Sequence, residues 1–242
     1  MSHKRTATGE YVGSELELFA RAQNWKSYWS SKIKPLLGNS ILEVGAGVGS
    51  NLLLLRENHQ QWTALEPDQT QSDTIAALLN EENPASSISV INGTLLDIDP
   101  EQVFDSIIYI DVLEHIENDV LEIKHAYKHL SKGGRIIVLA PAHQVLFSPF
   151  DNSVGHYRRY NKKTLSNLRP SKAVLETVFY LDSVGCIASW CNSKILKSGM
   201  PSKSQIWFWD RLMVPLSRVF DLITAYQLGK TIIAVFKKPG NI

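Results

Sequence analysis

The chain has 242 residues, 44% of them hydrophobic and 20% charged, which is typical of one globular domain (residues 1–242) with its own core. Its formal net charge of +1 is too small to indicate binding to nucleic acid, and no run of about 18 apolar residues predicts a membrane-spanning helix. The polar N-terminus predicts no signal peptide. Cys186 and Cys191 are too few for a disulfide framework or a four-ligand zinc site, so we expect reduced thiols in a cytoplasmic protein.

A helix is predicted over residues 14–36. Ser14 and Glu17 form a capping box at its start. Apolar residues then recur at helical spacing, and they are Leu18, Ala22, Trp25, Trp29 and Ile33. These residues are expected to pack on a sheet, while polar residues of the same helix, such as Tyr28, could contact a ligand.

Residues 40–51 read S-I-L-E-V-G-A-G-V-G-S-N, which predicts a short buried strand over Ile41–Val44 and a sharp turn into a helix. The glycines would let the backbone approach a ligand closely. They fall at 45, 47 and 49, which does not match the G-x-G-x-x-G spacing of a dinucleotide loop, so an NAD-dependent oxidoreductase is disfavoured. The carboxylate of Glu43 would repel a pyrophosphate but favour a ligand with a sulfonium or ammonium charge.

The pattern E-x-G-x-G-x-G resembles the cofactor loop of class I S-adenosylmethionine (SAM)-dependent methyltransferases. The resemblance implies that SAM, and after reaction S-adenosylhomocysteine, binds here. The implied cofactor residues of the loop are Glu43, Gly45, Ala46, Gly47 and Asn51. It also implies that the N-terminal helix is a lid over the cofactor, with Tyr28 as a polar contact.

The segment Trp62–Glu66 predicts a second strand that ends in acids. Glu66 lies about 20 residues after the glycines, where a Rossmann-type acid accepts hydrogen bonds from a ribose diol. A carboxylate suits this task because its two oxygens can accept from both hydroxyls. We therefore predict that Glu66, with Pro67 beside it, binds the ribose.

A helix from about Gln71 to Glu81 and a third strand over residues 87–92 are predicted next. Related methyltransferases commonly place an acid directly after the glycine that follows this strand, and that acid binds the adenine amino group. Here Thr94 occupies the position. The resemblance therefore implies that the Thr94 hydroxyl or the Leu95 backbone contacts adenine.

The segment Phe104–Ile110 predicts a buried central strand, with Asp111 at its carboxyl end beside the glycine loop. Together with the residues up to His115 it is similar to the F-D-x-I-x-x-x-x-V-L-E-H motif of class I methyltransferases. The resemblance implies that Asp111 and the Val112 backbone face the cofactor or the acceptor. His115 could brace the loop or act as a base, and we favour the bracing role.

An amphipathic helix over residues 116–130 is predicted to end at Gly133-Gly134, and a fifth strand to run from Arg135 to Pro141. His125 and His129 lie one turn apart but have no evident third ligand, so no metal site is predicted. Alternating strands and helices require a mostly parallel sheet with helices on both faces. The resemblance covers residues 14–141, with the SAM-binding core at 38–141, and implies a Rossmann-like fold with seven strands. The sixth strand would be residues 173–181, and the last, Thr231–Lys237, antiparallel.

The loop region over residues 142–170 follows the fifth strand and so emerges on the cofactor side of the sheet. It contains a G-H-x-R-R-Y stretch that is similar to one in bacterial methyltransferases. The residues that could bind an acceptor are Asp151, His156, Arg158, Arg159 and Tyr160. The alternative is that the arginines pair with Asp151 and with glutamates, and so only fix the loop.

Methyl transfer to an alcohol or phenol benefits from a base with a pKa near neutrality, and histidine supplies one. His156 is our first candidate for this base and His143 the second. An amine acceptor that binds in its neutral form would need no dedicated base.

Residues 184–229 form an apolar insertion before the last strand, in which Trp190, Trp207, Phe208 and many aliphatic residues alternate with lysine and arginine. It could line an acceptor pocket and form a homodimer, or rest on a membrane with its basic residues at the headgroups. Packing against the sheet is the third interpretation. Pro215 is expected to begin or kink a helix there.

The sequence therefore predicts a SAM-dependent methyltransferase that acts on a small molecule, at a hydroxyl oxygen of a secondary metabolite, sugar or lipid-linked compound. No nucleic-acid partner is expected, and peripheral contact with a membrane is left open. The alternative function is a SAM-binding regulatory or scaffold protein without turnover.

Overall fold

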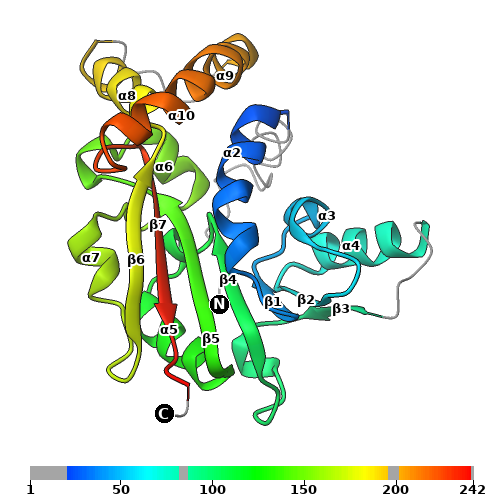
Figure 1. Ribbon diagram of the computed structural model, residues 1–242. Helices are drawn as coiled ribbons and strands as arrows, with labels where there is room; N and C mark the ends of the chain where they lie inside the picture. Colours follow the sequence, from blue (N-terminus) through cyan, green and yellow to red (C-terminus); the bar gives the residue numbers. More distant parts are fainter. Residues whose placement is uncertain (1–20, 82–86, 196–201, 241–242) are drawn as a thin grey trace.

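The computed structural model describes residues 21–81, 87–195 and 202–240 (Figure 1). Its centre is a seven-stranded sheet in the order β3-β2-β1-β4-β5-β7-β6. β7 is antiparallel to both of its neighbours, and every other pair is parallel, as predicted. The strands are β1 (Ser40–Val44), β2 (Gln61–Glu66), β3 (Ile88–Asn92), β4 (Phe104–Ile110), β5 (Leu130–Pro141), β6 (Val174–Leu181) and β7 (Thr231–Lys237).

Helices cover both faces of the sheet, because side chains that alternate along each strand are apolar on both sides. Ile41 of β1 and Ile108 of β4 pack with α2, α3 and α4 on one face, whereas Leu42 and Ile107 pack with α5 and α7 on the other. The helices are α2 (Gln23–Ile33), α3 (Ser50–Leu55), α4 (Gln69–Glu81), α5 (Asp119–Lys128), α6 (Pro149–Val154), α7 (Lys162–Ser166), α8 (Ser183–Ile195), α9 (Lys203–Phe208) and α10 (Val214–Ile223).

The predicted role of Gly133-Gly134 as a helix stop is wrong. α5 ends at Lys128, and β5 begins at Leu130, so both glycines lie inside the strand. The register against β4 shifts here, with Phe104 opposite Leu130 but Ser106 opposite Arg135. A side chain at Gly134 would meet the carbonyl oxygens of Ser131 and Asp105 at 2.9 and 3.0 Å, so this glycine allows a bulge and close approach of two strands.

The N-terminal helix is described from Gln23 onward, and the predicted capping box at Ser14 and Glu17 lies outside the described residues. Trp25, Trp29 and Ile33 are buried in the same cluster as β1, which confirms their packing role. The helix runs into a 3₁₀ turn over Lys34–Leu36 before β1 begins.

The insertion forms α8, followed by α9, a π-helical segment (Trp209–Met213) and α10 (Figure 1). Pro215 lies in the first turn of α10 directly after the π-helical segment, which agrees with the expectation that it begins or kinks a helix there. Within the described residues, the structure contains no helix that is both long and apolar enough to cross a membrane.

Candidate active site

The glycine-rich loop follows β1, which lies between β2 and β4 in the sheet. This is the position where the strand order reverses and where α/β sheets form ligand crevices. Gly45 and Gly47 have φ angles of +69° and +58°, which a side chain would disfavour. A Cβ at Gly45 would also lie 2.7 Å from Val112 Cγ2, so the loops after β1 and β4 touch.

Gly45→Ala is expected to destabilise the fold for two separable reasons. The left-handed backbone should cost about 1–2 kcal/mol, and overpacking against Val112 about 1–3 kcal/mol more. Gly133→Ala is the matched control, because Gly133 has a φ of +80° but no atom within 4 Å of the place that a Cβ would take. Urea unfolding of the two variants measures the difference. Equal losses of unfolding free energy in Gly45→Ala and Gly133→Ala would mean that the contact with Val112 does not restrict residue 45 to glycine.

Glu66 reaches from the end of β2 to the glycine loop. Its Oε2 accepts a hydrogen bond from Gly47 N at 2.8 Å, and its Oε1 accepts one from Asp68 N at 2.9 Å. These contacts orient the carboxylate at the glycine loop, and a carboxylate with two acceptor oxygens is the group that suits a diol. The structure therefore brings together the residues predicted for the loop and for the ribose.

Glu43 is buried under the loop, where its two oxygens accept hydrogen bonds from Asn51 Nδ2 at 3.0 Å and Trp62 Nε1 at 3.1 Å. Burial raises the pKa of this carboxyl group to about 7, although both hydrogen bonds lower it. Glu43 and Asn51 thus hold the loop from below. Direct contact of either residue with the cofactor stays a prediction.

The raised pKa of Glu43 predicts that stability depends on pH. The folded protein retains this proton between about pH 4.5 and about pH 7, whereas the unfolded chain releases it, so unfolding free energy should fall as pH rises through this window. The loss should be on the order of 3 kcal/mol. Urea unfolding of wild type and Glu43→Gln at about pH 5 and about pH 8 measures it. The glutamine variant should lose less stability, and parallel pH profiles would contradict this assignment.

Asp111 is exposed at the end of β4 with a φ of +54°, an uncommon conformation for a residue other than glycine. Strained residues of this kind cluster at functional sites. Because Val112 contacts Gly45, Asp111 lies on the same edge of the sheet as the glycine loop. Its predicted contact with the cofactor or the acceptor stays a prediction.

Two further predicted cofactor residues have partners elsewhere. The Tyr28 hydroxyl donates a 2.8 Å hydrogen bond to Asp221 of α10, and its ring is buried between α2 and the insertion. The Thr94 hydroxyl donates to Asp97 Oδ2 at 3.0 Å in a capping box that starts a 3₁₀ turn over Leu95–Asp97. These contacts explain both residues as structural, and their cofactor roles stay predictions.

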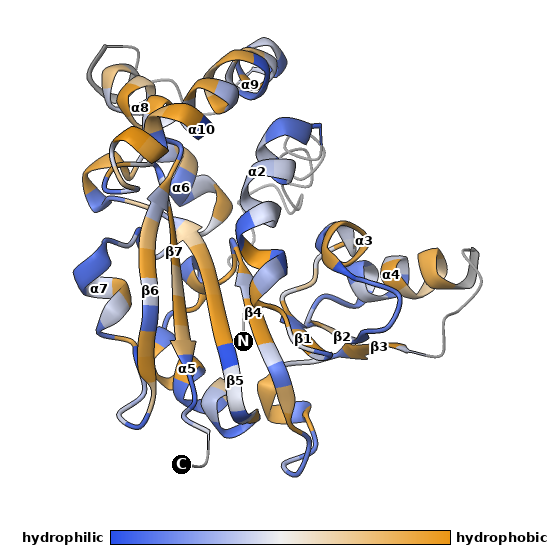
Figure 2. Ribbon diagram, in the orientation of Figure 1, coloured by the Kyte–Doolittle hydropathy of each residue, from blue (hydrophilic) through white to orange (hydrophobic). Residues whose placement is uncertain are grey.

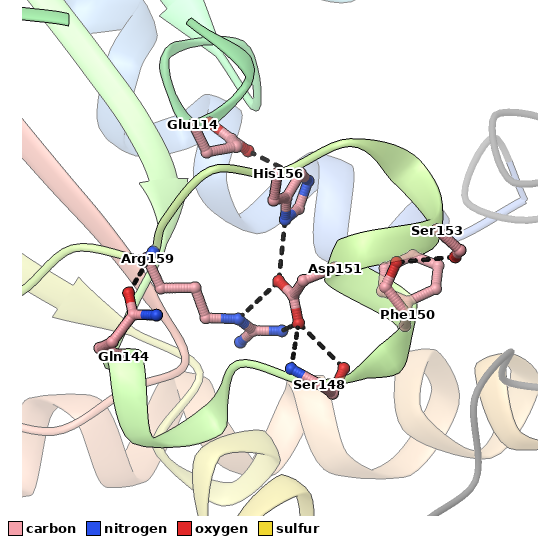
Figure 3. Close-up of polar contacts among 8 residues, drawn as sticks. All are labelled: Glu114, Gln144, Ser148, Phe150, Asp151, Ser153, His156 and Arg159. Atoms are coloured by element: carbon pink, nitrogen blue, oxygen red, sulfur yellow. Dashed lines mark hydrogen bonds and ion pairs between the residues drawn. The ribbon is translucent and has the colours of Figure 1, made fainter. Parts of the chain in front are cut away.

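The loop after β5 is organised around Asp151 of α6 (Figure 3). Ser148 and Asp151 form a capping box at the start of this short helix, and Gly155, with a φ of +85°, ends it. His156 follows directly, and its Nδ1 lies 2.8 Å from Asp151 Oδ1. Arg159 donates to both oxygens of the same carboxylate, at 2.7 and 2.9 Å.

The charges of this cluster fix the orientation of His156. Burial alone would raise the pKa of Asp151, but hydrogen bonds from His156 and Arg159 hold it well below its ordinary value. An ionised Asp151 can only accept, so the proton between the two side chains lies on His156 Nδ1. His156 Nε2 is then the nitrogen that can accept a proton from another group.

Glu114 is a site residue that the sequence analysis did not single out. It is fully buried, and neither carboxylate oxygen has a hydrogen-bond partner within the described chain. Burial and the nearby charge of Asp111 raise its pKa well above the ordinary value, which favours the protonated form. Its Oε1 lies 3.9 Å from His156 Nε2 (Figure 3). The position of Glu114 in the V-L-E-H segment is the sequence feature that could have identified it as a site residue.

Arg158 and Tyr160 bond to Asp119. Arg158 forms a 2.7 Å ion pair with Asp119, and the buried Tyr160 hydroxyl donates to the same carboxylate at 2.8 Å. The pairing alternative for the arginines therefore describes the contacts of this structure, with Asp119 as the partner of Arg158. Acceptor binding by Arg158, Arg159 and Tyr160 stays a prediction.

His143 lines an apolar cavity of about 280 Å³ between the loop after β5 and α8. Its ring stacks on Tyr180 with the centroids 4.7 Å apart, and its Nε2 is buried without a hydrogen-bond partner in the described chain. Burial lowers the pKa of His143, which keeps the imidazole neutral. The other lining residues are Val145, Leu146, Cys186, Ile187, Trp190 and Leu228.

Glu114, His115 and His156 each offer a ligand atom within 4.8 Å of the others, so these three residues could hold a metal ion. The rings of His115 and His156 pack edge to face at 4.6 Å. The expectation that the protein uses no metal was drawn from His125 and His129, which are not part of this group. It stays a prediction.

Comparison with known proteins identifies the family of the chain. A family model described as a methyltransferase domain matches residues 17–174, well over half of the chain. The chain belongs to this methyltransferase family. SAM is its cofactor.

The methyltransferase is similar to parts of two curated proteins. Ubiquinone biosynthesis O-methyltransferase of Rickettsia conorii is 29% identical over 98 residues, which cover 40% of this chain and 33% of that protein. tRNA U34 carboxymethyltransferase of Alteromonas mediterranea is 27% identical over 124 residues, which cover 47% and 37%. The chain thus spans about a third of the length of these relatives.

A solved structure of geranyl diphosphate methyltransferase in complex with SAM superimposes on the methyltransferase with a TM-score of 0.63. The match covers 94% of this chain and 91% of that one at 11% identity, so it shows a shared fold.

The residues of the methyltransferase fit SAM. A Cβ at Gly47 would meet no atom closer than Gln71 Oε1 at 3.5 Å, so the loop leaves space for a ligand. Glu66 would hold the ribose hydroxyls beside this space. A sulfonium bound above the buried Glu43 would favour the ionised form of this carboxyl group, whose pKa lies near 7.

Proposed function

We propose that the protein transfers the methyl group of SAM to a hydroxyl oxygen of a small, largely apolar molecule. The observation that carries this proposal is the pairing of His156 with Asp151, which orients a histidine nitrogen as a proton acceptor at the cofactor edge of the sheet. An oxygen acceptor must lose a proton during transfer, whereas a neutral amine needs no base at that step.

Bound SAM supplies an activated methyl group, so the protein has mainly to position the acceptor and remove its proton. His156 Nε2 would accept the hydroxyl proton while Nδ1–H stays bonded to Asp151. Asp151 stabilises the resulting imidazolium, as the aspartate of a Ser-His-Asp triad does. Arg159 keeps Asp151 ionised and in place.

The apolar cavity beside His143 is the proposed acceptor site. Its walls are mostly aliphatic and aromatic, and a cavity of about 280 Å³ admits a small ring system or part of a chain. His143 follows the carboxyl end of β5, and the adjacent Gln144 accepts a 2.9 Å hydrogen bond from Arg159 N, so the cavity lies beside the loop that carries His156. The relative named for ubiquinone O-methylation supports an apolar oxygen acceptor, and the relative named for tRNA modification makes nucleic acid the competing class.

Incubation of the pure protein with a cell extract and SAM labelled in its methyl group tests the proposal. Label in the organic phase is expected, in a product whose new methyl group is lost under conditions that cleave ethers or esters. The Glu66→Ala variant is the control and should transfer no label. Label that ribonuclease releases would replace the small molecule by RNA. SAM binding without any labelled product would favour the regulatory or scaffold alternative.

A further inference from the structure

The segment from Lys203 to Ile223 is an amphipathic helix whose apolar side faces outward. α9, the π-helical segment and α10 follow without a break, since the joining residues Phe208 and Met213 have helical backbone angles. The outward side chains recur at about every fourth position, as on one side of a helix. They are Phe208, Leu212, Leu216, Phe220 and Ile223, each 47–72% exposed, with Trp207, Val219 and Leu222 beside them.

The inward side of this helix combines the buried apolar Ile206, Trp209 and Val214 with buried polar side chains that bond to the neighbouring helices. Asp210 accepts from the backbone of Trp25 at 2.8 Å at the start of α2. Asp221 accepts from the backbone of Asp182 and Ser183 at 2.8 and 2.9 Å at the start of α8. Ser217 donates to Asp182 at 2.6 Å. These directional bonds fix the rotation of the helix and so hold its apolar side away from the core.

We call the exposed apolar side chains of α8, α9, the π-helical segment and α10 the insertion face. α8 contributes Ile187 and Trp190, and it packs directly against α10. Ten of the eighteen large apolar side chains that are exposed in the described chain lie on this face. Figure 2 shows α8 and α10 as largely hydrophobic at one end of the molecule. Concentrated apolar surface of this kind marks an interaction site.

The charges around the insertion face have one sign. Lys203 and Arg211 are exposed, whereas Asp210 and Asp221, the acids of the described insertion, are buried and bonded to backbone. Arg21, Lys203 and Arg211 also line a cavity of about 360 Å³ next to Trp207. Asp210 lies in the wall of the same cavity, where its carboxylate accepts from the backbone of Asn24 and Trp25. A second copy of the chain docked on this face would bring like charges together with no exposed acid to pair them. An anionic surface is complementary.

We propose that the insertion face docks on the surface of an anionic lipid bilayer, with a lipid phosphate in the cavity lined by Arg21, Lys203 and Arg211. Trp207 and Phe208 beside this cavity enter the headgroup region, where aromatic side chains are favoured. The proposed acceptor cavity is lined by Ile187 and Trp190 of the insertion face and by the exposed Val145 beside them. An apolar acceptor could therefore reach that cavity from the bilayer, a step that rests on the proposed function.

Vesicle flotation with the full chain tests the docking proposal independently of catalysis. The probes are vesicles of phosphatidylcholine alone and of phosphatidylcholine mixed with phosphatidylglycerol. Lys203 and Arg211 together predict roughly 30-fold tighter binding to the mixed vesicles, Arg21 adds to this preference, and added salt should weaken it. Lys203→Glu/Arg211→Glu should lose this preference, and Leu216→Gln/Ile223→Gln should bind at least tenfold more weakly to both vesicles (roughly the effect of two lost apolar contacts).

Matched controls distinguish the insertion face from exposed residues elsewhere. Val120→Gln on α5 and Lys172→Glu before β6 change exposed residues outside the insertion and should bind as the wild type does. Thermal unfolding and SAM affinity verify that each variant is folded. Failure of the wild type to float with mixed vesicles would overturn the proposal, as would equal binding by all variants. So would a dimer in solution that Leu216→Gln/Ile223→Gln dissociates while no vesicle binding is seen.

Discussion

His156→Gln is expected to lower kcat by about 10²–10⁴-fold while leaving SAM affinity within a few-fold of wild type. Glutamine can still bond to Asp151, so the loop should keep its shape, but it cannot accept a proton at neutral pH. His156 contacts Asp151 and Glu114 and none of the residues predicted for the ribose. Single-turnover rates with the acceptor found by labelling, together with calorimetric titration of SAM, separate the two effects.

Chemical rescue distinguishes a base from a positioning residue. Added imidazole should restore part of the rate of His156→Ala, because it can fill the space and accept the proton. His59→Ala is the control, since His59 is mostly exposed and pairs only weakly with Glu57. A His156→Ala variant with an unchanged rate would remove this residue as the base and leave His143 as the candidate. A lost rate that imidazole does not restore would assign His156 a structural role.

Asp151→Asn should give a large part of the same loss for a different reason. Asparagine in place of the carboxylate no longer fixes the proton on Nδ1 of His156, and Arg159 loses its ion pair.

If methyl transfer instead depends on a metal ion held by Glu114, His115 and His156, chelation should abolish the activity of the wild type. We expect chelation to have no effect, and activity that returns on addition of a divalent cation would contradict that expectation.

The strands and the glycine loop could be predicted because their determinants are local. Val44 and the glycines at 45 and 47 specify a strand and a sharp turn within a few residues, and the apolar run before Asp111 specifies a buried strand. The ribose role predicted for Glu66 rests on its offset from the loop and stays a prediction, but the structure does place Glu66 Oε2 beside the loop, 2.8 Å from Gly47 N. Local pattern and tertiary arrangement agree there.

Other parts depend on contacts between residues far apart in the sequence. Tyr28 bonds to Asp221, 193 positions away, and no local pattern in the N-terminal helix indicates that partner. In the sequence, Glu114 looks like an ordinary acid at the start of a turn. Its raised pKa comes from burial in the folded protein and from the nearby charge of Asp111, which no local pattern shows. Gly133-Gly134 resembles a helix stop because a bulge against β4 cannot be inferred from β5 alone.

The orientation of the insertion helix also depends on contacts that its amphipathic pattern does not show. The sequence shows apolar residues at helical spacing, and the usual inference is that they face a core. In this helix Asp210, Ser217 and Asp221 face inward instead and form buried hydrogen bonds. Leaving these polar groups unpaired would cost more free energy than exposing single leucines to solvent. The polar residues of this helix therefore decide its orientation.

Glu66→Gln is expected to weaken SAM binding at least 100-fold. Two charge-assisted hydrogen bonds to a ribose diol contribute about 1.5–3 kcal/mol each, and the amide can accept at only one atom. The substitution also sets an amide donor against Gly47 N or Asp68 N, both of which donate to the wild-type carboxylate. Calorimetric titration with SAM and with S-adenosylhomocysteine should show equal losses, because both ligands carry the same ribose.

The design of this measurement separates ribose recognition from disturbance of the loop. Asp68→Asn is the matched control, since it changes the charge of the next acid on the same turn while keeping a side chain that can cap α4. A 2′,3′-dideoxy analogue of S-adenosylhomocysteine completes a double cycle. If Glu66 binds the diol, the analogue should bind weakly to wild type and lose little more in Glu66→Gln. Full additivity of the two losses would mean that Glu66 acts only through the loop, and the predicted ribose contact would then be wrong.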